Sequence, residues 1–166
     1  REALFMALGD LDGVRVVDLY AGSGALAIEA LSRGAAWADL VDSDRRARET
    51  IERNLEDLDL KDSVRVWPFR LPSGLARLGG VLAAAGVVFV DPPYGGEDAR
   101  AVLAGLGAEG MLKSGTRVIL ETHAKDEVPE RQGTLVRERE RKYGETVVHV
   151  YRAGGQPVVP TESEGS

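Results

Sequence analysis

The stretch Val14-Arg15-Val16-Val17-Asp18-Leu19-Tyr20-Ala21-Gly22-Ser23-Gly24-Ala25-Leu26 decides the fold. Residues 14–19 are rich in valine, which predicts a strand, and the helical pattern of residues 25–33 ends at Gly34, a common helix stop. A strand that passes through a glycine turn directly into a helix begins a βαβ unit. The stretch therefore predicts an α/β protein built on a parallel sheet.

The rest of the chain repeats this alternation of β-branched runs and helix-period segments. Further parallel strands are predicted at residues 38–41, 64–67, 87–90 and 117–120. The segments between them predict helices near residues 51–58, 75–82 and 99–106, because their apolar side chains recur every three or four positions. The run Val87-Val88-Phe89-Val90 is apolar throughout, as expected of a central strand covered on both faces.

The last part of the chain predicts an antiparallel hairpin. Within residues 135–141, arginine and glutamate alternate from Arg137 to Arg141, and residues 146–151 return as a second strand after a turn at 143–145. A strand would put Arg137, Arg139 and Arg141 on one face and the two intervening glutamates on the other. We therefore expect an α/β, Rossmann-like fold with a mostly parallel seven-stranded sheet, a C-terminal antiparallel hairpin and helices on both faces.

Composition limits the classes of function. The 166 residues suit one domain, and the absence of cysteine excludes disulfide frameworks, zinc fingers and thiol catalysis. With only two histidines, no metal site is expected. The 21 basic and 27 acidic residues give a net charge of −6, which argues against a general nucleic-acid binder.

The ends of the chain carry further expectations. We find no signal peptide or membrane span in the sequence and expect a cytoplasmic protein. Because the chain begins at Arg1, inside an apparent helix, we expect it to lack an N-terminal extension of a longer protein. One domain is expected over residues 1–152. Residues 153–166 are rich in Gly, Pro, Ser and Glu and are expected to form a disordered tail.

The glycine turn and a later aspartate suggest a cofactor that contains a nucleoside. Glycines let a ligand approach the start of the helix closely, although this short pattern also fits a plain strand–helix turn. Asp42 follows Gly22 by 20 positions, at the end of the second strand, where a carboxylate can bind both ribose hydroxyls. A dinucleotide and S-adenosylmethionine both remain candidates. Asp18 would repel a pyrophosphate and suit an ammonium group, which favours S-adenosylmethionine.

The tetrad Asp91-Pro92-Pro93-Tyr94 directly follows the fourth predicted strand. Asp91 and the Pro92 carbonyl supply two acceptors past the carboxyl end of the sheet, where open α/β sheets bind ligands. Tyr94 adds a flat face on which a base can stack. Two acceptors on an exocyclic amine draw its lone pair out of conjugation, so the tetrad suits methyl transfer to an amino group of a planar base.

These residues resemble a known family. The stretches Asp18–Leu26 and Glu29–Ala35 and the tetrad at 91–94 are similar to the RsmD family, bacterial methyltransferases that modify the N2 amine of a guanine in 16S ribosomal RNA. Residues 1–5 also resemble the family's N-terminal helix, and residues 142–146 its C-terminal hairpin. The resemblance implies a class I methyltransferase fold, S-adenosylmethionine as cofactor, and 16S rRNA within an assembling small subunit as partner. We also expect a monomer that does not bind membranes.

The resemblance assigns roles by position. The catalytic residues would be Asp91, Pro92, Pro93 and Tyr94. The cofactor-binding residues would be Asp18, Tyr20, Ala21, Gly22, Ser23, Gly24, Asp42, Ser43, Phe69, Arg70 and Asp91. The substrate-binding residues would be Tyr94, Arg137, Arg139, Arg141, Lys142 and Tyr143. One departure concerns adenine: the family commonly has an acidic or amide residue after the third strand, where this chain has Trp67-Pro68-Phe69-Arg70.

Several alternatives stay open at the level of sequence. The methyl acceptor could be the N6 amine of adenine, and an NAD-dependent oxidoreductase or a non-catalytic nucleotide-binding module would also use the glycine turn. The hairpin arginines either contact RNA phosphates or pair with neighbouring glutamates. Tyr143 either stacks on a nucleotide or packs against the sheet. Glu121 either faces the site or caps its strand, and His123 is expected in a surface loop.

Overall fold

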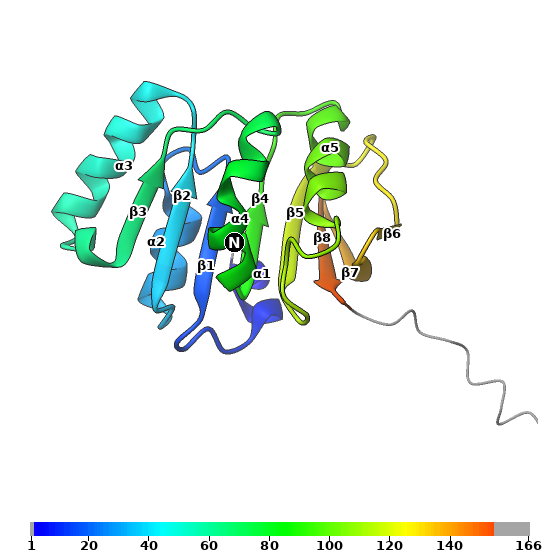
Figure 1. Ribbon diagram of the computed structural model, residues 1–166, viewed down its shortest axis with the longest axis horizontal. Helices are drawn as coiled ribbons and strands as arrows, with labels where there is room; N and C mark the ends of the chain where they lie inside the picture. Colours follow the sequence, from blue (N-terminus) through cyan, green and yellow to red (C-terminus); the bar gives the residue numbers. More distant parts are fainter. Residues whose placement is uncertain (1, 155–166) are drawn as a thin grey trace, which may run out of the picture.

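The computed structural model describes residues 2–154. Its strands are β1 (Arg15–Leu19), β2 (Trp37–Val41), β3 (Val64–Trp67), β4 (Val87–Val90), β5 (Arg117–His123), β6 (Arg131–Gln132), β7 (Leu135–Tyr143) and β8 (Thr146–Ala153). Its α-helices are α1 (Glu2–Leu8), α2 (Ala25–Ser32), α3 (Arg45–Asp57), α4 (Gly79–Ala84) and α5 (Glu97–Leu106), and two short 3-10 helices are η1 (Lys61–Ser63) and η2 (Ser73–Leu78). Within residues 2–154 the strands form an eight-stranded sheet in the order β3-β2-β1-β4-β5-β8-β7-β6 (Figure 1).

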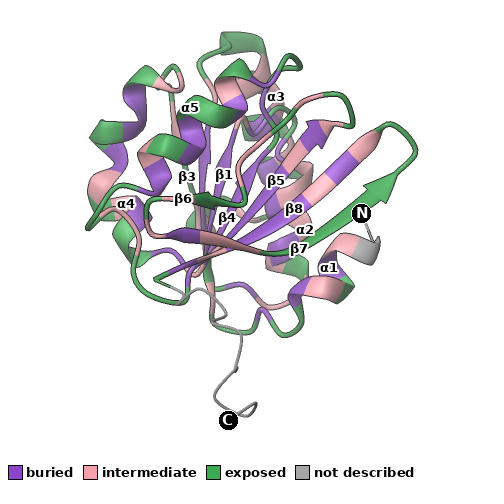
Figure 2. Cartoon of the chain, turned by 90° about the vertical axis from the view of Figure 1, so that its right-hand side faces the viewer, coloured by how far each residue is buried: buried purple, intermediate pink, exposed green. Residues whose placement is uncertain are grey.

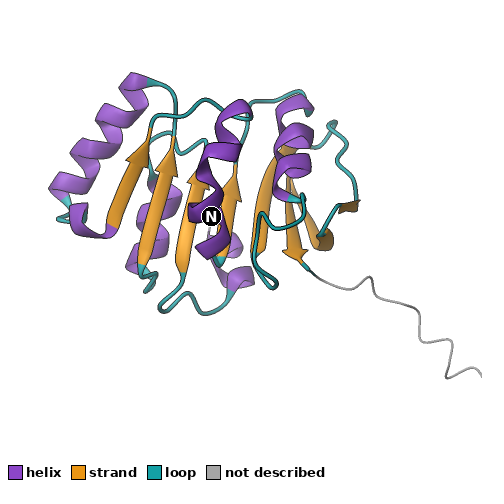
Figure 3. Cartoon of the chain, viewed as in Figure 1, coloured by secondary structure: helices purple, strands orange, loops and turns teal. Residues whose placement is uncertain are grey.

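The centre of the sheet is parallel and its C-terminal side is antiparallel (Figure 3). Strand β1 pairs in parallel with β2 on one side and with β4 on the other. The chain order therefore reverses between β1 and β4, which makes their carboxyl ends the topological switch point where α/β sheets bind ligands. The glycine turn follows β1 and the Asp91 tetrad follows β4, so both motifs lie at this point.

Helices cover both faces of the sheet, as predicted. On one face Phe5 of α1 and Ile51 of α3 pack with Phe89 of the central strand β4, and all three are buried. On the other face Leu82 of α4 and Leu103 of α5 are fully buried. Figure 2 shows the buried strands enclosed between the helices. The switch point thus lies at the ends of strands that are packed on both faces.

The predicted strand count of seven is wrong, because the sheet has eight strands. The additional strand β6 contains only two residues, Arg131 and Gln132, which pair with Val136 and Leu135. Two residues are too few to show an alternating pattern in a sequence. The expected disordered tail lies almost entirely outside the described residues.

A β-bulge in β7 also changes the predicted arrangement of the arginines. Arg137 pairs with Tyr151 whereas Arg139 pairs with Val150, so β7 has one extra residue between the two pairs. Cross-strand partners share a face, and neighbouring residues of β8 point to opposite faces. Arg137 therefore lies on the face opposite Arg139 and Arg141, and the prediction of a single arginine face is wrong.

A buried carboxylate joins β2 and β3. Asp39 is only 4% exposed and accepts hydrogen bonds from the indole Nε1 atoms of Trp67 at 2.9 Å and Trp37 at 3.0 Å. These two donors compensate the loss of hydration that burial of a carboxylate entails. Trp67, the last residue of β3, is thereby fixed at the carboxyl end of the sheet, whereas Trp37 is held at the start of β2.

Among residues 2–154, no helix is long and apolar enough to cross a membrane. The same part of the chain contains no group of three or more His, Asp or Glu side chains that could hold a metal ion.

Candidate active site

The turn after β1 has backbone angles that favour glycine. Gly22 and Gly24 have φ values of +60° and +83°. A Cβ on Gly24 would lie 3.0 Å from a methyl group of Leu40, whereas a Cβ on Gly22 would meet open space. Gly24 therefore lets α2 pack closely on the sheet, and Gly22 leaves room for a ligand beside the turn.

Asp42 holds this turn in place from the neighbouring strand. Its Oδ2 accepts a hydrogen bond from the N–H of Gly22, and its Oδ1 accepts one from the N–H of Asp44, both at 2.9 Å. The N–H of Ala21 donates to the carbonyl of Val41 at 3.0 Å. Because a carboxylate offers about four lone-pair sites, Asp42 retains acceptor capacity toward a ligand.

Asp18 is a buried carboxyl at the end of β1. It is 2% exposed, and its Oδ2 has no hydrogen-bond partner among the residues that the structure describes. Burial raises the pKa of Asp18 well above its usual range, and the nearby charges of Asp91 and Asp42 raise it further. Within residues 2–154 no cationic side chain pairs with this carboxyl. Its oxygens can therefore accept hydrogen bonds from a ligand that carries an ammonium group.

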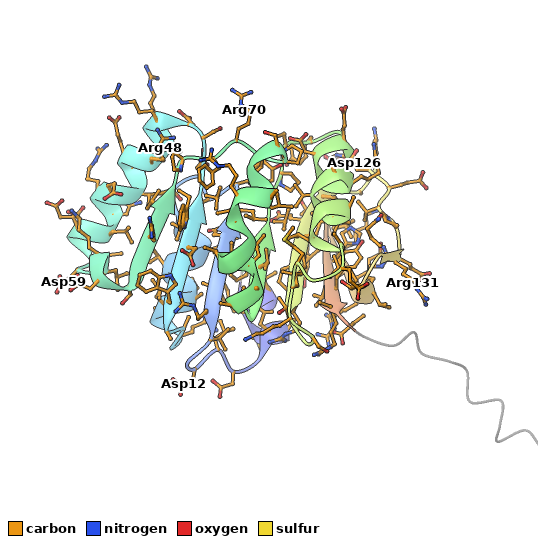
Figure 4. The ribbon with its side chains drawn as sticks, viewed as in Figure 1. Asp12, Arg48, Asp59, Arg70, Asp126 and Arg131 are labelled. Atoms are coloured by element: carbon orange, nitrogen blue, oxygen red, sulfur yellow. The ribbon has the colours of Figure 1, made fainter. Side chains whose placement is uncertain are left out.

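One cavity of about 420 Å³ collects most of the remaining predicted cofactor residues. It is lined by Tyr20, Val41, Asp42, Ser43, Phe69, Arg70, Leu71, Pro93 and Asp98. The ring of Phe69 packs on that of Trp67 with 5.7 Å between centroids, so this wall is aromatic and fixed. Figure 4 shows Arg70 at the carboxyl edge of the sheet, where it is exposed and points away from the core. The cavity therefore suits a nucleoside better than it suits a polyphosphate.

Tyr20 forms part of the wall between this cavity and the tetrad. Its hydroxyl is buried and has no hydrogen-bond partner within residues 2–154. Burial, with a smaller contribution from Asp98, raises the pKa of Tyr20 so that it is neutral at physiological pH. Its φ of +63° is strained for a non-glycine residue, and such strain concentrates at functional sites.

The tetrad opens onto a second, shallower cavity of about 320 Å³, lined by Tyr20, Asp91, Pro92, Pro93 and Tyr94. Desolvation raises the pKa of Asp91. Tyr94 is 78% exposed, and its ring meets the edge of His123 with 5.8 Å between centroids and 82° between planes. His123 is the last residue of β5, so its expected loop position is wrong. The exposed face of Tyr94 can stack on a planar group.

A third cavity, of about 470 Å³, also has Asp91 in its lining. It is lined by Leu4, Leu26, Asp91, Glu121, Tyr143, Thr146 and Val148. The sequence is compatible with Glu121 either facing the site or capping its strand, and the structure shows it on the cavity wall. Glu121 follows a buried run of β5 and is level with the tetrad. This position is the sequence signal that could have favoured a site residue over a strand cap.

The predicted substrate-binding residues of the hairpin divide between two faces. Tyr143 lines the 470 Å³ cavity and shares its face with Arg139 and Arg141, and all three are exposed. Arg137 lies on the opposite face because of the bulge, and Lys142 lies there because it alternates with Arg141 and Tyr143. Only the first group shares a face with Val148 and Thr146, which line this cavity.

Arg137 is instead part of a partly buried network. Its side chain is 17% exposed, and its Nη1 donates to Nδ1 of His149 at 3.4 Å. Nδ1 is therefore unprotonated, and Nε2 donates to Oγ1 of Thr122 at 3.0 Å. Burial, assisted by the charge of Arg137, lowers the pKa of His149 to about 4. Arg137 therefore stabilises the sheet.

The reversed strand order, the glycine turn, and the tetrad after β4 define a class I methyltransferase. Residues 1–152 match the model of the family described as conserved hypothetical protein 95. The chain belongs to this family, the RsmD family of methyltransferases that the sequence resembles. This membership confirms the prediction of an enzyme of the S-adenosylmethionine-dependent methyltransferase class. It argues against the two alternatives, an NAD-dependent oxidoreductase and a non-catalytic nucleotide-binding module.

Individual relatives agree with this membership. The chain is 35% identical over 156 residues to "Putative rRNA methyltransferase YlbH" of Bacillus subtilis, covering 93% of this chain and 85% of the relative. It is 31% identical over 157 residues to "Ribosomal RNA small subunit methyltransferase D" of Escherichia coli strain K12, covering 94% and 77%. A solved structure of a conserved hypothetical protein from Streptococcus pyogenes superposes with a TM-score of 0.82 at 34% identity, covering 92% and 94%.

Proposed function

We propose that the protein transfers the methyl group of S-adenosylmethionine to the exocyclic N2 amine of a guanine in 16S rRNA of the small ribosomal subunit. The observation that carries the proposal is the position of Asp91, which lines the 320 Å³ cavity together with Tyr20 and Pro93, two residues that also line the 420 Å³ cavity of the predicted cofactor residues. Asp91 can therefore hold an acceptor base next to the cofactor cavity. The name of the Escherichia coli relative, which refers to small-subunit ribosomal RNA, supports the choice of substrate.

The cofactor would be held by three groups around the switch point. Asp18 would accept the ammonium group, which would supply the cation that its buried Oδ2 lacks. Asp42 would accept hydrogen bonds from the ribose hydroxyls with its remaining lone pairs. Phe69 would cover the adenine in place of the family's usual acidic or amide side chain. When bound, S-adenosylmethionine supplies an electrophilic methyl group on a sulfonium.

Asp91 would orient the amine for attack. Its carboxylate and the carbonyl of Pro92 would accept the two N2–H groups and so direct the nitrogen lone pair toward the methyl group. With the methyl group that the cofactor supplies, a nitrogen–carbon bond would form as the sulfur–carbon bond breaks, and the product amine would then release one proton. Asp91 is suited to accept that proton because desolvation raises its pKa. Tyr94 would stack on the base and fix its plane.

RNA would approach along the hairpin. Arg139 and Arg141 share their face with Tyr143, which borders the cavity beside Asp91. Arginine suits contacts to phosphates because its planar fork can donate two hydrogen bonds at once. With a net charge of −6, the protein would depend on local contacts and on the shape of the assembling subunit, where we propose that it acts as a cytoplasmic monomer.

The test is methylation of small subunits isolated from Escherichia coli cells that lack methyltransferase D. We expect the protein, with radiolabelled S-adenosylmethionine, to add one methyl group, which mass spectrometry of the digested 16S rRNA identifies as N2-methylguanosine. Asp91→Ala should lower kcat at least about 100-fold, because it removes an acceptor from the reacting amine. Asp57→Ala, a change at an exposed residue of α3, is the matched control. N6-methyladenosine as product, or full activity of Asp91→Ala, would contradict the proposal.

A further inference from the structure

The 470 Å³ cavity contains a second carboxylate beside that of Asp91. The last parallel pair between β4 and β5 joins Val90 to Leu120, so Asp91 and Glu121 are level with each other one residue further on. Both line this cavity, and both also line the smaller recess behind it. The two carboxylates thus form neighbouring acceptors on one wall.

The strand pairing on the other side of β5 fixes the direction of Glu121. Glu121 pairs with Val148 of β8, and cross-strand partners share a face. Val148 lines the same cavity, so the Glu121 side chain is directed into it and away from the α5 face. Glu121 is only partly exposed, and its carboxylate therefore interacts more strongly with a ligand than an exposed one would.

The remaining walls suit a flat base. Leu4 of α1 and Leu26 of α2 give an apolar side, and Tyr143 brings an aromatic ring from the hairpin. Apolar walls exclude water from hydrogen bonds formed at the carboxylates and so strengthen them. The cavity thus combines two acceptors with apolar walls, and Tyr143 in its lining shares a face with Arg139 and Arg141.

The pattern of donors distinguishes guanine from the other bases that carry an amine. Guanine presents a ring N1–H directly beside its exocyclic N2 amine, so that two adjacent positions donate. In adenine and cytosine the ring nitrogen beside the amine is an acceptor, and its lone pair would face a carboxylate. Adjacent acceptors on the protein therefore match guanine alone among these bases.

We infer that Glu121 is the residue that selects guanine, by accepting the N1–H of the base while Asp91 accepts the neighbouring N2 amine. This inference rests on the proposed function and extends it from the reacting amine to base identity. An unsuitable base would leave the Glu121 carboxylate opposite a lone pair, and sites of this kind reject such analogues strongly.

The test uses 2-aminopurine, which keeps the amine at position 2 but has an acceptor at N1. After mass spectrometry has located the modified guanosine, ligated 16S rRNA with guanosine or 2-aminopurine at that position is assembled into small subunits. We expect wild-type kcat/KM to be roughly 100-fold lower for 2-aminopurine. In Glu121→Gln the amide can accept from guanine N1–H or donate to 2-aminopurine N1. The values of kcat/KM for the two substrates should therefore lie within about threefold of each other.

The control variant is Glu109→Gln, at an exposed position outside the three cavities, which should discriminate like wild type. Equal wild-type rates on the two substrates, or undiminished discrimination by Glu121→Gln, would overturn the inference. The wild-type comparison stands even if the variant does not fold. Failure of wild type to methylate guanosine at N2 would overturn the proposed function itself, and the inference with it.

Discussion

The Oδ2 atom of Asp42 accepts a hydrogen bond from the backbone N–H of Gly22 at 2.9 Å, across 20 residues of sequence. The carboxylate that follows β2 therefore also shapes the glycine turn that follows β1. Because the other oxygen of Asp42 is held by the N–H of Asp44, the carboxylate has a fixed orientation before any ligand binds. Preorganisation of this kind lowers the cost of binding.

Replacement of Asp42 should lower the affinity for the cofactor more than it lowers the free energy of unfolding. In Asp42→Asn one acceptor oxygen becomes a donor, so the amide satisfies only one of the two N–H groups and presents less acceptor capacity to the ribose. We expect the Kd for S-adenosylmethionine, measured by calorimetry, to rise roughly 10- to 100-fold. Asp57→Asn on α3 serves as the control, and an unchanged Kd in Asp42→Asn would refute this role.

The two glycines of the turn should respond differently to alanine. Gly24→Ala places a methyl group 3.0 Å from Leu40 in a left-handed conformation, so unfolding in urea should require about 2 kcal/mol less free energy. Gly22→Ala has the same conformational cost but meets open space, so it should fold better than Gly24→Ala while impeding the ligand. Equal losses of stability in the two variants would show that packing against Leu40 has no effect.

Asp18 should make the ligand-free protein less stable as pH rises. Burial raises its pKa above the unfolded value, so its carboxyl is fully tolerated below the unfolded pKa and opposes folding as pH rises through the higher, folded value. Asp18→Asn lacks this charge. The free energy of unfolding of Asp18→Asn, minus that of wild type, should therefore increase from acidic to neutral pH, as measured by urea denaturation.

The same variant should bind S-adenosylmethionine at least about 10-fold more weakly, since the ammonium group loses its carboxylate partner. Stability and affinity would then change in opposite directions. Parallel pH profiles for Asp18→Asn and wild type, or unchanged affinity, would argue against a buried ionisable site at this position.

The bulge in β7 separates two kinds of arginine. Arg139→Ala combined with Arg141→Ala should raise KM for small subunits and reduce its salt dependence, because phosphate contacts release counterions. The Kd for S-adenosylmethionine should not change. Arg137→Ala should instead lower the free energy of unfolding by about 1–3 kcal/mol, since His149 and Glu140 lose a buried partner. If Arg137→Ala affected only KM, the division of the hairpin would be wrong.

Sequence patterns could predict the parallel strands, the glycine turn and the tetrad, because each depends on local periodicity or on neighbouring residues. They could not predict the bulge, since an extra residue in an alternating run leaves the alternation of residue types unchanged. Nor could they decide the role of Glu121. The cavity that it lines is completed by α1 and the hairpin, whose residues Leu4 and Thr146 are distant in sequence and meet only in the fold.

The pair of indoles bound to Asp39 has a consequence for how the protein can be observed. Trp37 and Trp67 are the two tryptophans of the chain, so its ultraviolet emission arises from the β2–β3 edge. Trp67 packs on Phe69, which lines the cavity proposed for adenine. A ligand that shifts the Phe69 ring changes the surroundings of a natural fluorophore directly. The unlabelled enzyme thus carries its own optical probe of cofactor binding.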